Sequence, residues 1–338
     1  MDVLSDVLAV MRSGKPRSAV VTWRAPWAQE FAAVPGAVGF HLVVEGTCVL
    51  LPGGAEPVTL GPGDLVLRAH GDGHVLADTL ATRPFAPACR PDRVPLPRHA
   101  AATAPGHSDG IVAVLLCGAY EVDPDLVHPL LLDLPDVIHI PASSAHSAQL
   151  RSTAELLTAE LRQPKPGTEA LVPGLLDTLL VYVLRSVLDR AAERATGWAA
   201  ALHDPGIAAA LRAVHTEPAR AWTVAGLADE ARMSRATFAR RFAGLVGQPP
   251  LSYLTWWRMT TAATLLRAGD TALDVVAAGV GYTSTFAFGT AFKRRFGMAP
   301  GRYRRAGSAT ATTGPIGRLD PRILGVAPAM SEEVAPVV

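Results

Sequence analysis

Three histidines in the N-terminal quarter of the chain could together bind a metal ion. His41 lies in an apolar run, and His70 and His74 follow about thirty residues later. Neutral imidazole nitrogens are ligands for zinc, copper, iron and nickel. The alternative is that His74 only anchors a loop through hydrogen bonds. We expect no resident metal or other cofactor, and these three side chains are the candidates if one is bound.

The cysteines are the second group of reactive side chains. There are three, an odd and small number that argues against a disulfide framework and for a reducing compartment. Cys48 and Cys117 lie inside apolar stretches and are interpreted as small core residues. Cys89 differs because Arg90 and Arg93 follow it, and nearby cations favour the reactive thiolate form of a cysteine. A redox-sensing role for Cys89 and an idle loop thiol both fit this pattern.

Short β-strands are the elements expected to position these side chains. Apolar or alternating runs between Gly/Pro turns predict strands at 18–23, 40–46, 47–51, 58–60, 65–67, 110–120 and 137–140. The second and third are expected to pair as a hairpin, and 82–108 is expected to be a loop that crosses the barrel. Short strands with tight turns favour a β-sandwich or barrel.

Helical periodicity follows the strands. It predicts helices at 2–11 and 147–163, and a third that Pro173 opens and that ends near residue 192. The third is apolar over more than half its circumference, whereas a surface helix needs one apolar stripe. We therefore expect it to contact both the barrel and a second copy of the chain, with an intramolecular helix pair as the alternative. The expected dimerisation residues are Leu176, Leu180, Leu184 and Val187.

Two short helix–turn–helix patterns, about fifty residues apart, lie between 221 and 305. Thr223, Ser234 and Ser284 are expected to cap helices because each precedes an apolar-periodic run. A continuous amphipathic helix over 251–266 would hold the two patterns apart. Its expected inward residues are Leu251, Leu254, Trp257, Ala262, Leu265 and Leu266. Those of the two patterns are Phe238, Phe242, Leu245, Leu273, Val276, Ala277, Phe288, Ala291 and Phe292.

Charge indicates what this segment faces. Residues 206–307 contain 14 Lys and Arg against 5 Asp and Glu, and the remainder contains 17 against 25, so a chain of net charge +1 divides into a basic and an acidic part. All but one of those 14 cations are arginine, which is suited to bidentate phosphate and guanine contacts. A basic helix–turn–helix segment points to DNA. The alternative is a small helical domain with a solvated cationic face.

The segment 204–305 resembles the AraC/XylS family of transcription regulators. The run Val-Val-Ala-Ala-Gly-Val-Gly-Tyr-Thr-Ser at 275–284 carries the resemblance, with Phe288, Phe-Lys-Arg-Arg-Phe-Gly at 292–297, Pro300 and Tyr303-Arg304. The resemblance implies two recognition helices that enter successive major-groove faces, roughly 34 Å apart.

The same resemblance assigns the DNA-contacting residues. Thr290 stands where the family usually has arginine, and Trp256 replaces a common arginine of the spacer helix. We therefore expect Arg240 to supply most of the direct readout, and the second helix to use apolar contacts and phosphate anchoring. The expected base-facing residues are Ala236, Ala239, Arg240, Thr285, Phe286, Gly289 and Thr290. The expected surface is completed by Ser234, Arg235, Thr237, Arg241, Ser284, Lys293 and Arg294.

The N-terminal half resembles the cupin-type sensor of one AraC branch, some members of which respond to oxidants through their cysteines. Gly63-Asp64, Gly71, His74 and Asp78 resemble the second cupin motif, with Ala69 in the usual Pro place and Asp for Asn at 78. The paired His-x-His of the first motif is absent, because Val43 follows His41 at that spacing. No cysteine here matches a sensing thiol of that branch position by position.

Together these patterns predict an α+β protein. Residues 1–195 would form a cupin-like barrel with two dimerisation helices, 196–205 a linker, 206–306 an all-α double helix–turn–helix domain and 307–338 a disordered tail. We expect a bacterial, cytoplasmic homodimer that binds double-stranded promoter DNA and RNA polymerase, more often as an activator. Its barrel would sense an unknown small molecule or an oxidant.

Two other functions fit parts of the same sequence. In the first, the barrel binds an organic effector or merely dimerises, with no redox or metal chemistry. In the second, a cupin metalloenzyme is fused to a DNA-binding module. The sequence contains no nucleotide-binding loop, hydrolase elbow or zinc-protease helix, so we expect no catalysis. No run approaches 18 uninterrupted apolar residues, so we expect no membrane-spanning helix.

Overall fold

The computed structural model describes residues 2–11, 16–85, 87–90, 99–103, 112–121, 125–144, 146–192 and 196–311. The chain forms two compact units, each described by itself. The barrel unit contains residues 15–120 and 136–183, and the helical unit contains 1–14, 121–135 and 184–315. The α+β prediction is confirmed. These units are not continuous in sequence, because the N-terminal helix and the segment 121–135 belong to the helical unit.

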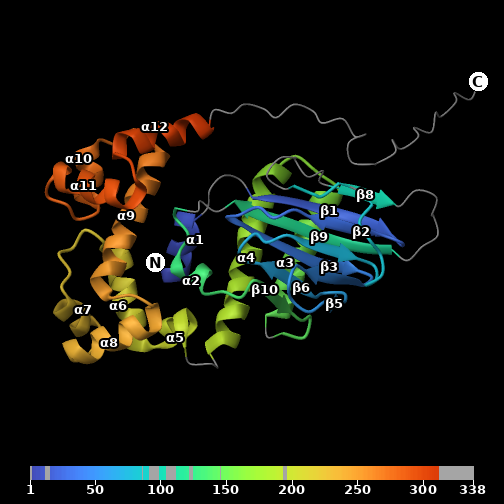
Figure 1. The fold of residues 1–338 in the computed structure, drawn as a ribbon, viewed down its shortest axis with the longest axis horizontal. Coiled ribbons are helices and arrows are strands. Elements are labelled where there is room, and N and C mark those ends of the chain that lie inside the picture. The colour runs from blue at the N-terminus through green and yellow to red at the C-terminus, as the bar shows by residue number, and fades with distance from the viewer. Residues whose placement is uncertain are drawn as a thin grey trace, which may run out of the picture. The chain divides into compact units, whose positions relative to one another are not determined.

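Two sheets form the barrel unit (Figure 1). The six-stranded sheet has the order β10 (Val137–Ile140), β6 (Leu65–Arg68), β3 (Ala37–Glu45), β9 (Val112–Glu121), β1 (Arg17–Arg24) and β8 (His99–Thr103). The four-stranded sheet has the order β2 (Ala28–Phe31), β7 (His74–Ala77), β4 (Cys48–Pro52) and β5 (Val58–Leu60). Apolar side chains such as Val43, Leu50, Leu60, Val66 and Leu115 are fully buried and form a common core with the stacked pair Trp23–Trp27.

The strand pairing corrects two expectations. β3 and β4 are not a hairpin, because they lie in different sheets and β4 pairs with β5 and β7. The stretch 82–108 contains β8, which pairs in parallel with β1 and whose sequence His-Ala-Ala-Ala-Thr has no β-branched run to announce it. The structure does not describe residues 86, 91–98 and 104–108 of this stretch. The short strands β2 and β7 were also not predicted, because no alternation of apolar and polar residues marks them.

Two helices follow the strands, α3 (Ser147–Arg162) in the barrel unit and α4 (Thr168–Ala192), whose residues from 184 on belong to the helical unit. α3 packs on β1, and the Tyr120 hydroxyl at the end of β9 donates to the carbonyl of Leu176 in α4. α4 begins at Thr168, five residues before the expected start. Thr168 accepts a hydrogen bond from the Lys165 amide and donates one to Glu160, so Pro173 lies inside the helix.

The proposed dimerisation residues are buried within one chain. Their exposed fractions are 0% for Leu176, 9% for Leu180, 1% for Leu184 and 7% for Val187. These four side chains are thus buried in the single chain, and the contact of α4 with a second copy stays a prediction. By length and composition alone α4 could cross a membrane, but buried core helices pass the same test.

Ten helices are described in the helical unit. Before the barrel strands comes α1 (Val3–Met11), and after β9 comes α2 (Pro129–Leu132). The others are α5 (Gly197–His203), α6 (Pro205–Thr216), α7 (Val224–Glu230), α8 (Arg235–Val246), α9 (Pro250–Ala268), α10 (Leu273–Gly279), α11 (Thr285–Phe296) and α12 (Pro300–Ala311).

This arrangement corrects the expected domain ends. The proposed linker 196–205 contains α5, and its Trp198 is only 3% exposed, so this stretch is part of the folded unit. α12 continues to Ala311, beyond the expected end at 306. The rest of the expected tail lies outside the described residues.

Candidate functional site

The first helix–turn–helix is formed by α7 and α8. Thr223 accepts a hydrogen bond from the Gly226 amide, and Ser234 accepts one from the Thr237 amide, so both expected caps are confirmed. On the inner face of α8, Phe238 and Phe242 are fully buried. Leu245, expected beside them, is only partly buried, and Val246 fills the core instead.

The second helix–turn–helix repeats this plan with α10 and α11. Ser284 caps α11 by accepting a hydrogen bond from the Ala287 amide, as expected. Phe288 and Phe292 are buried as their counterparts are in α8. Leu273 was expected to face inward, but it is 38% exposed. It is the first residue of α10, where the helix has not yet reached the core formed by Val276 and Ala277, and Ala291 packs on that core partly buried.

α9 is the expected spacer helix, and Figure 1 shows it running between the α7–α8 pair and the α10–α11 pair. Four of its six expected inward residues are buried, namely Leu254, Trp257, Ala262 and Leu266. Leu251 and Leu265 are about 40% exposed, so the inward face is narrower than the apolar pattern suggested. Because α9 contacts α8, α10, α11 and α12, it fixes the two helix pairs in one unit.

Nearly all of the expected DNA-contacting residues are at the surface. Ala239 and Gly289 are half-buried, and the other twelve are exposed. Phe286, at the start of α11, is 83% exposed, which is unusual for a phenylalanine and suits apolar contact with a thymine methyl group. Arg241 is exposed too, and its Nε donates to Asp204, the residue that caps α6, so Arg241 also braces α6 against α8.

A buried polar chain in the helical unit was not predicted. The Leu130 amide donates to Nδ1 of His128, so Nε2 of that ring carries the proton and donates to the Tyr253 hydroxyl at 3.1 Å. The Tyr253 hydroxyl in turn donates to Nε2 of His215 at 2.6 Å. Nδ1 of His215 faces the Asp6 carboxylate at 3.3 Å. These bonds tie α1 and the segment after β9 to α6 and α9.

Removal of one hydroxyl should break this chain at its centre. We expect Tyr253→Phe to lower the unfolding free energy of the helical unit by about 2–3 kcal/mol, because two buried imidazole nitrogens lose their partner. Urea unfolding followed by circular dichroism measures this. Tyr282→Phe, which lies outside the polar chain, is the control and should stay near wild type. If Tyr253→Phe and Tyr282→Phe have the same unfolding free energy, the buried polar chain contributes nothing to stability.

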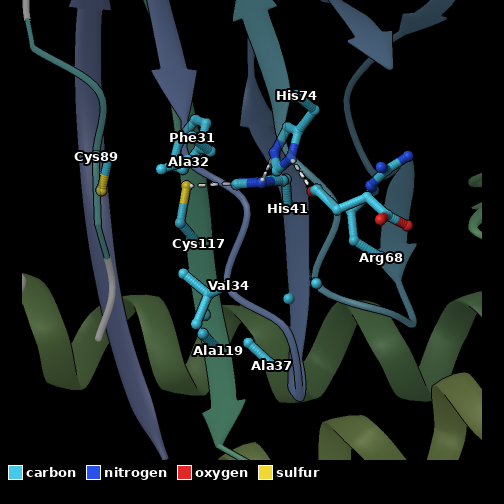
Figure 2. A pocket seen from close by; sticks show the side chains of 14 residues that line it. Phe31, Ala32, Val34, Ala37, His41, Arg68, His74, Cys89, Cys117 and Ala119 are labelled. Carbon is cyan, nitrogen blue, oxygen red and sulfur yellow. Dashed lines mark hydrogen bonds between the residues drawn. The ribbon is translucent and has the colours of Figure 1, made fainter. Parts of the chain in front are cut away.

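The barrel unit contains a small pocket that is partly open to solvent. Figure 2 shows His41 of β3 at its centre, between Cys117 of β9 and His74 of β7. Nδ1 of His41 lies 3.2 Å from the Cys117 sulfur, and Nε2 lies 2.7 Å from Nε2 of His74. The Phe31 ring stacks on His74, with ring centroids 4.8 Å apart.

The pocket unites only some of the candidate residues. His41, His74 and Cys89 line it, but His70 does not and lies instead 3.6 Å from Asp136. Cys89 is held there by backbone bonds to β2, since its amide donates to the Glu30 carbonyl. Among the described residues, no group of three or more His, Cys, Asp or Glu side chains is arranged to hold a metal ion.

Sequence reasoning missed two residues of this pocket. Cys48 and Cys117 are both buried, as expected, but Cys117 also contacts His41. Arg68, the last residue of β6, lines the pocket and is 2% exposed. An arginine at the end of an apolar strand is a signal that could have found it, because buried arginines are rare without a partner.

Burial keeps these groups neutral. It lowers the pKa of His74 to about 4, with the Arg68 charge adding to the effect, and it places the pKa of His41 well below the usual histidine value. Burial also raises the pKa of the Cys117 thiol, with Cys89 and Cys48 contributing. At neutral pH the pocket therefore holds an uncharged histidine pair and a protonated thiol.

The histidine pair predicts acid sensitivity of the barrel. An unfolded histidine titrates near pH 6.5, so between this value and about 4 the unfolded chain binds more protons than the folded one. The contribution of His74 to the unfolding free energy of the barrel is complete above pH 6.5. It should fall on acidification by on the order of 2–3 kcal/mol. Calorimetry of the barrel transition at pH 7.5 and 5 tests this. His74→Gln should flatten the pH dependence, and an unchanged dependence would contradict it.

Comparison with known proteins gives matches over both units. Residues 2–189 match a family model described as Cupin, and residues 227–306 match one described as Helix-turn-helix domain. An AraC-like transcription regulator of Streptomyces lividans is 38% identical over 313 residues, which are 90% of this chain and 98% of that protein. The RCS-specific HTH-type transcriptional activator RclR of Escherichia coli is 28% identical over 270 residues, 79% of this chain and 84% of that protein.

Among solved structures, the DNA-binding domain of AdpA in complex with a target DNA is 36% identical and has a TM-score of 0.31. That match covers 33% of this chain and 99% of that domain. The match to the Streptomyces regulator extends over nearly the whole of both proteins, and the cupin match covers more than half of the chain. The chain therefore belongs to the AraC family of DNA-binding transcription regulators, with an N-terminal cupin domain and a C-terminal helix–turn–helix domain.

Proposed function

We propose that this regulator binds promoter DNA through the exposed faces of α8 and α11 and that its barrel pocket receives the signal. The proposal is supported chiefly by two capped helices whose outer faces expose four side chains to solvent, namely Arg240, Phe286, Lys293 and Arg294. In this proposal the protein acts in the cytoplasm as a homodimer, recruits RNA polymerase as an activator and has no catalytic activity.

Chain connectivity supports a route from pocket to DNA. Cys117, Gly118 and Ala119 of β9 line the pocket. A few residues further on, Leu126 is buried in the core of the second helix–turn–helix, and His128 is bonded to Tyr253. A shift of β9 on effector binding would therefore be transmitted along a short length of chain to the DNA-binding unit.

We favour a small-molecule effector because the pocket is lined largely by apolar groups and its deepest thiol is protonated. A redox signal is the second candidate, since Cys89 and Cys117 line the same pocket. A two-electron oxidant such as hydrogen peroxide would convert the Cys89 thiolate to a sulfenic acid.

Footprinting on the region that flanks the protein's own gene tests the proposal. We expect protection of a discrete site, and a change in its affinity when effector or oxidant is added. If peroxide changes the affinity of wild type but not of Cys89→Ser, the redox signal is supported. If both respond equally or neither responds, Cys89 is not the sensor. Absence of any protected site would contradict the proposed promoter binding.

A further inference from the structure

A buried cation in the barrel pocket has hydrogen-bond donors without acceptors. The Arg68 side chain is almost completely buried, yet its Nε and Nη1 atoms have no hydrogen-bond partner. Burial lowers the pKa of this guanidinium, and the charges of Asp72 and Asp136 only partly compensate. Burial of a charge without hydrogen-bonded partners is costly, so such a group is expected to have a ligand.

The surroundings of Arg68 define the chemistry of that ligand. In Figure 2, Arg68 lies beside His74 and His41, and Phe31, Val34 and Ala37 line the same pocket. The two histidines are uncharged at neutral pH, so they supply polar contacts without further positive charge. Asp72 also lines the pocket, but it is exposed to solvent. A phosphate dianion would need more cationic donors than these residues provide.

We propose that the pocket binds a small organic carboxylate, with the carboxylate on the guanidinium of Arg68 and an apolar remainder against Phe31 and Val34. The guanidinium offers planar donors that match carboxylate oxygens, and the apolar walls exclude water from the pair. This assignment rests on the sensory role proposed above for the barrel and names the class of effector. It explains why a buried cation is kept where Asp72 and Asp136 compensate its charge only in part and two of its donor atoms have no acceptor among the described residues.

Matched acids and amides test the proposal on the full-length protein. Benzoate and hexanoate should raise the unfolding midpoint of the barrel in proportion to the logarithm of their concentration, whereas benzamide and hexanamide, of the same shape but neutral, should not. Arg68→Met should weaken benzoate binding, measured by calorimetric titration, by about tenfold or more. Arg162→Met, which removes an exposed ion pair with Glu45, is the control and should bind as wild type does.

Three outcomes would overturn the carboxylate site: no binding of either acid at millimolar concentration, equal binding of acids and amides, or unchanged benzoate affinity of Arg68→Met. Without ligand, Arg68→Met should be at least as stable as wild type, because it removes an unpaired buried charge. A marked loss of stability would assign Arg68 to the fold instead. Arg68→Lys, which keeps the charge and loses the planar donors, should bind benzoate with intermediate affinity.

The same experiment separates this proposal from the sensory role. DNA affinity is measured for wild type with and without saturating benzoate. If benzoate binds through Arg68 and leaves DNA affinity unchanged, the sensory role fails and the carboxylate site stands. If DNA affinity responds to another signal and no carboxylate binds, the sensory role stands and the carboxylate site fails.

Discussion

Replacement of Arg240 by alanine is expected to weaken binding to the cognate duplex by about tenfold to a hundredfold and to relax base preference at one position. The side chain is exposed on α8, six residues after the capping Ser234. A bidentate contact from arginine to guanine contributes about 1–3 kcal/mol of discrimination against the wrong base. Fluorescence anisotropy with the footprinted duplex, and with duplexes changed one base pair at a time, measures both effects.

The neighbouring Arg241 is the matched control. Its guanidinium is held by Asp204, so Arg241→Ala should lower the stability of the helical unit slightly and leave base preference unchanged. If instead Arg240→Ala leaves operator discrimination intact while Thr290→Ala abolishes it, the second recognition helix carries the readout and the assignment is reversed.

Substitution of Gly281 by alanine is expected to destabilise the helical unit by about 3 kcal/mol or more and to abolish DNA binding. Gly281 lies in the turn of the second helix–turn–helix with φ +82°, where a Cβ would lie 2.7 Å from the Ala219 carbonyl oxygen and 2.7 Å from the Arg258 guanidinium. Arg258 cannot move cheaply, since its Nε donates to the Pro218 carbonyl. Backbone strain and overpacking therefore add.

Substitution of Gly297 by alanine is the comparison that separates backbone strain from steric crowding. Gly297 ends α11 at φ +72°, and nothing lies within 4 Å of a Cβ placed there. Gly297→Ala should cost only about 1 kcal/mol, the strain of a left-handed conformation. Urea unfolding of the two variants is the comparison. Equal losses of stability would show that the turn at Gly281 has room for a side chain and that its close packing is unimportant.

The helix–turn–helix unit was predictable because its signals are local. Caps such as Ser234 and Ser284 and the phenylalanines behind them are set by spacing within a dozen residues, and the structure confirms them. The burial of side chains at helix ends was less predictable, as Leu245 and Leu273 show. It depends on which other elements pack against the end of the helix.

The barrel pocket and the buried polar chain depend on contacts between distant residues. His41 meets His74 across 33 positions and Cys117 across 76, and His128 meets Tyr253 across 125. No periodicity reports such pairs, so the sequence suggested the histidines but grouped His70 with them wrongly. The β3–β4 hairpin failed for a similar reason: adjacent strands suggest pairing, but here the turn carries the chain from one sheet to the other.

Methylation interference at guanine N7 tests whether α8 and α11 bind DNA in the major groove, because N7 lies in that groove. With the full-length protein on its footprinted duplex, we expect two clusters of guanines whose methylation interferes with binding, about one helical turn apart. Arg240→Ala should erase one cluster and leave the other. A single cluster that survives this substitution, or no binding of duplex DNA at low ionic strength, would show that α8 and α11 are not paired recognition helices.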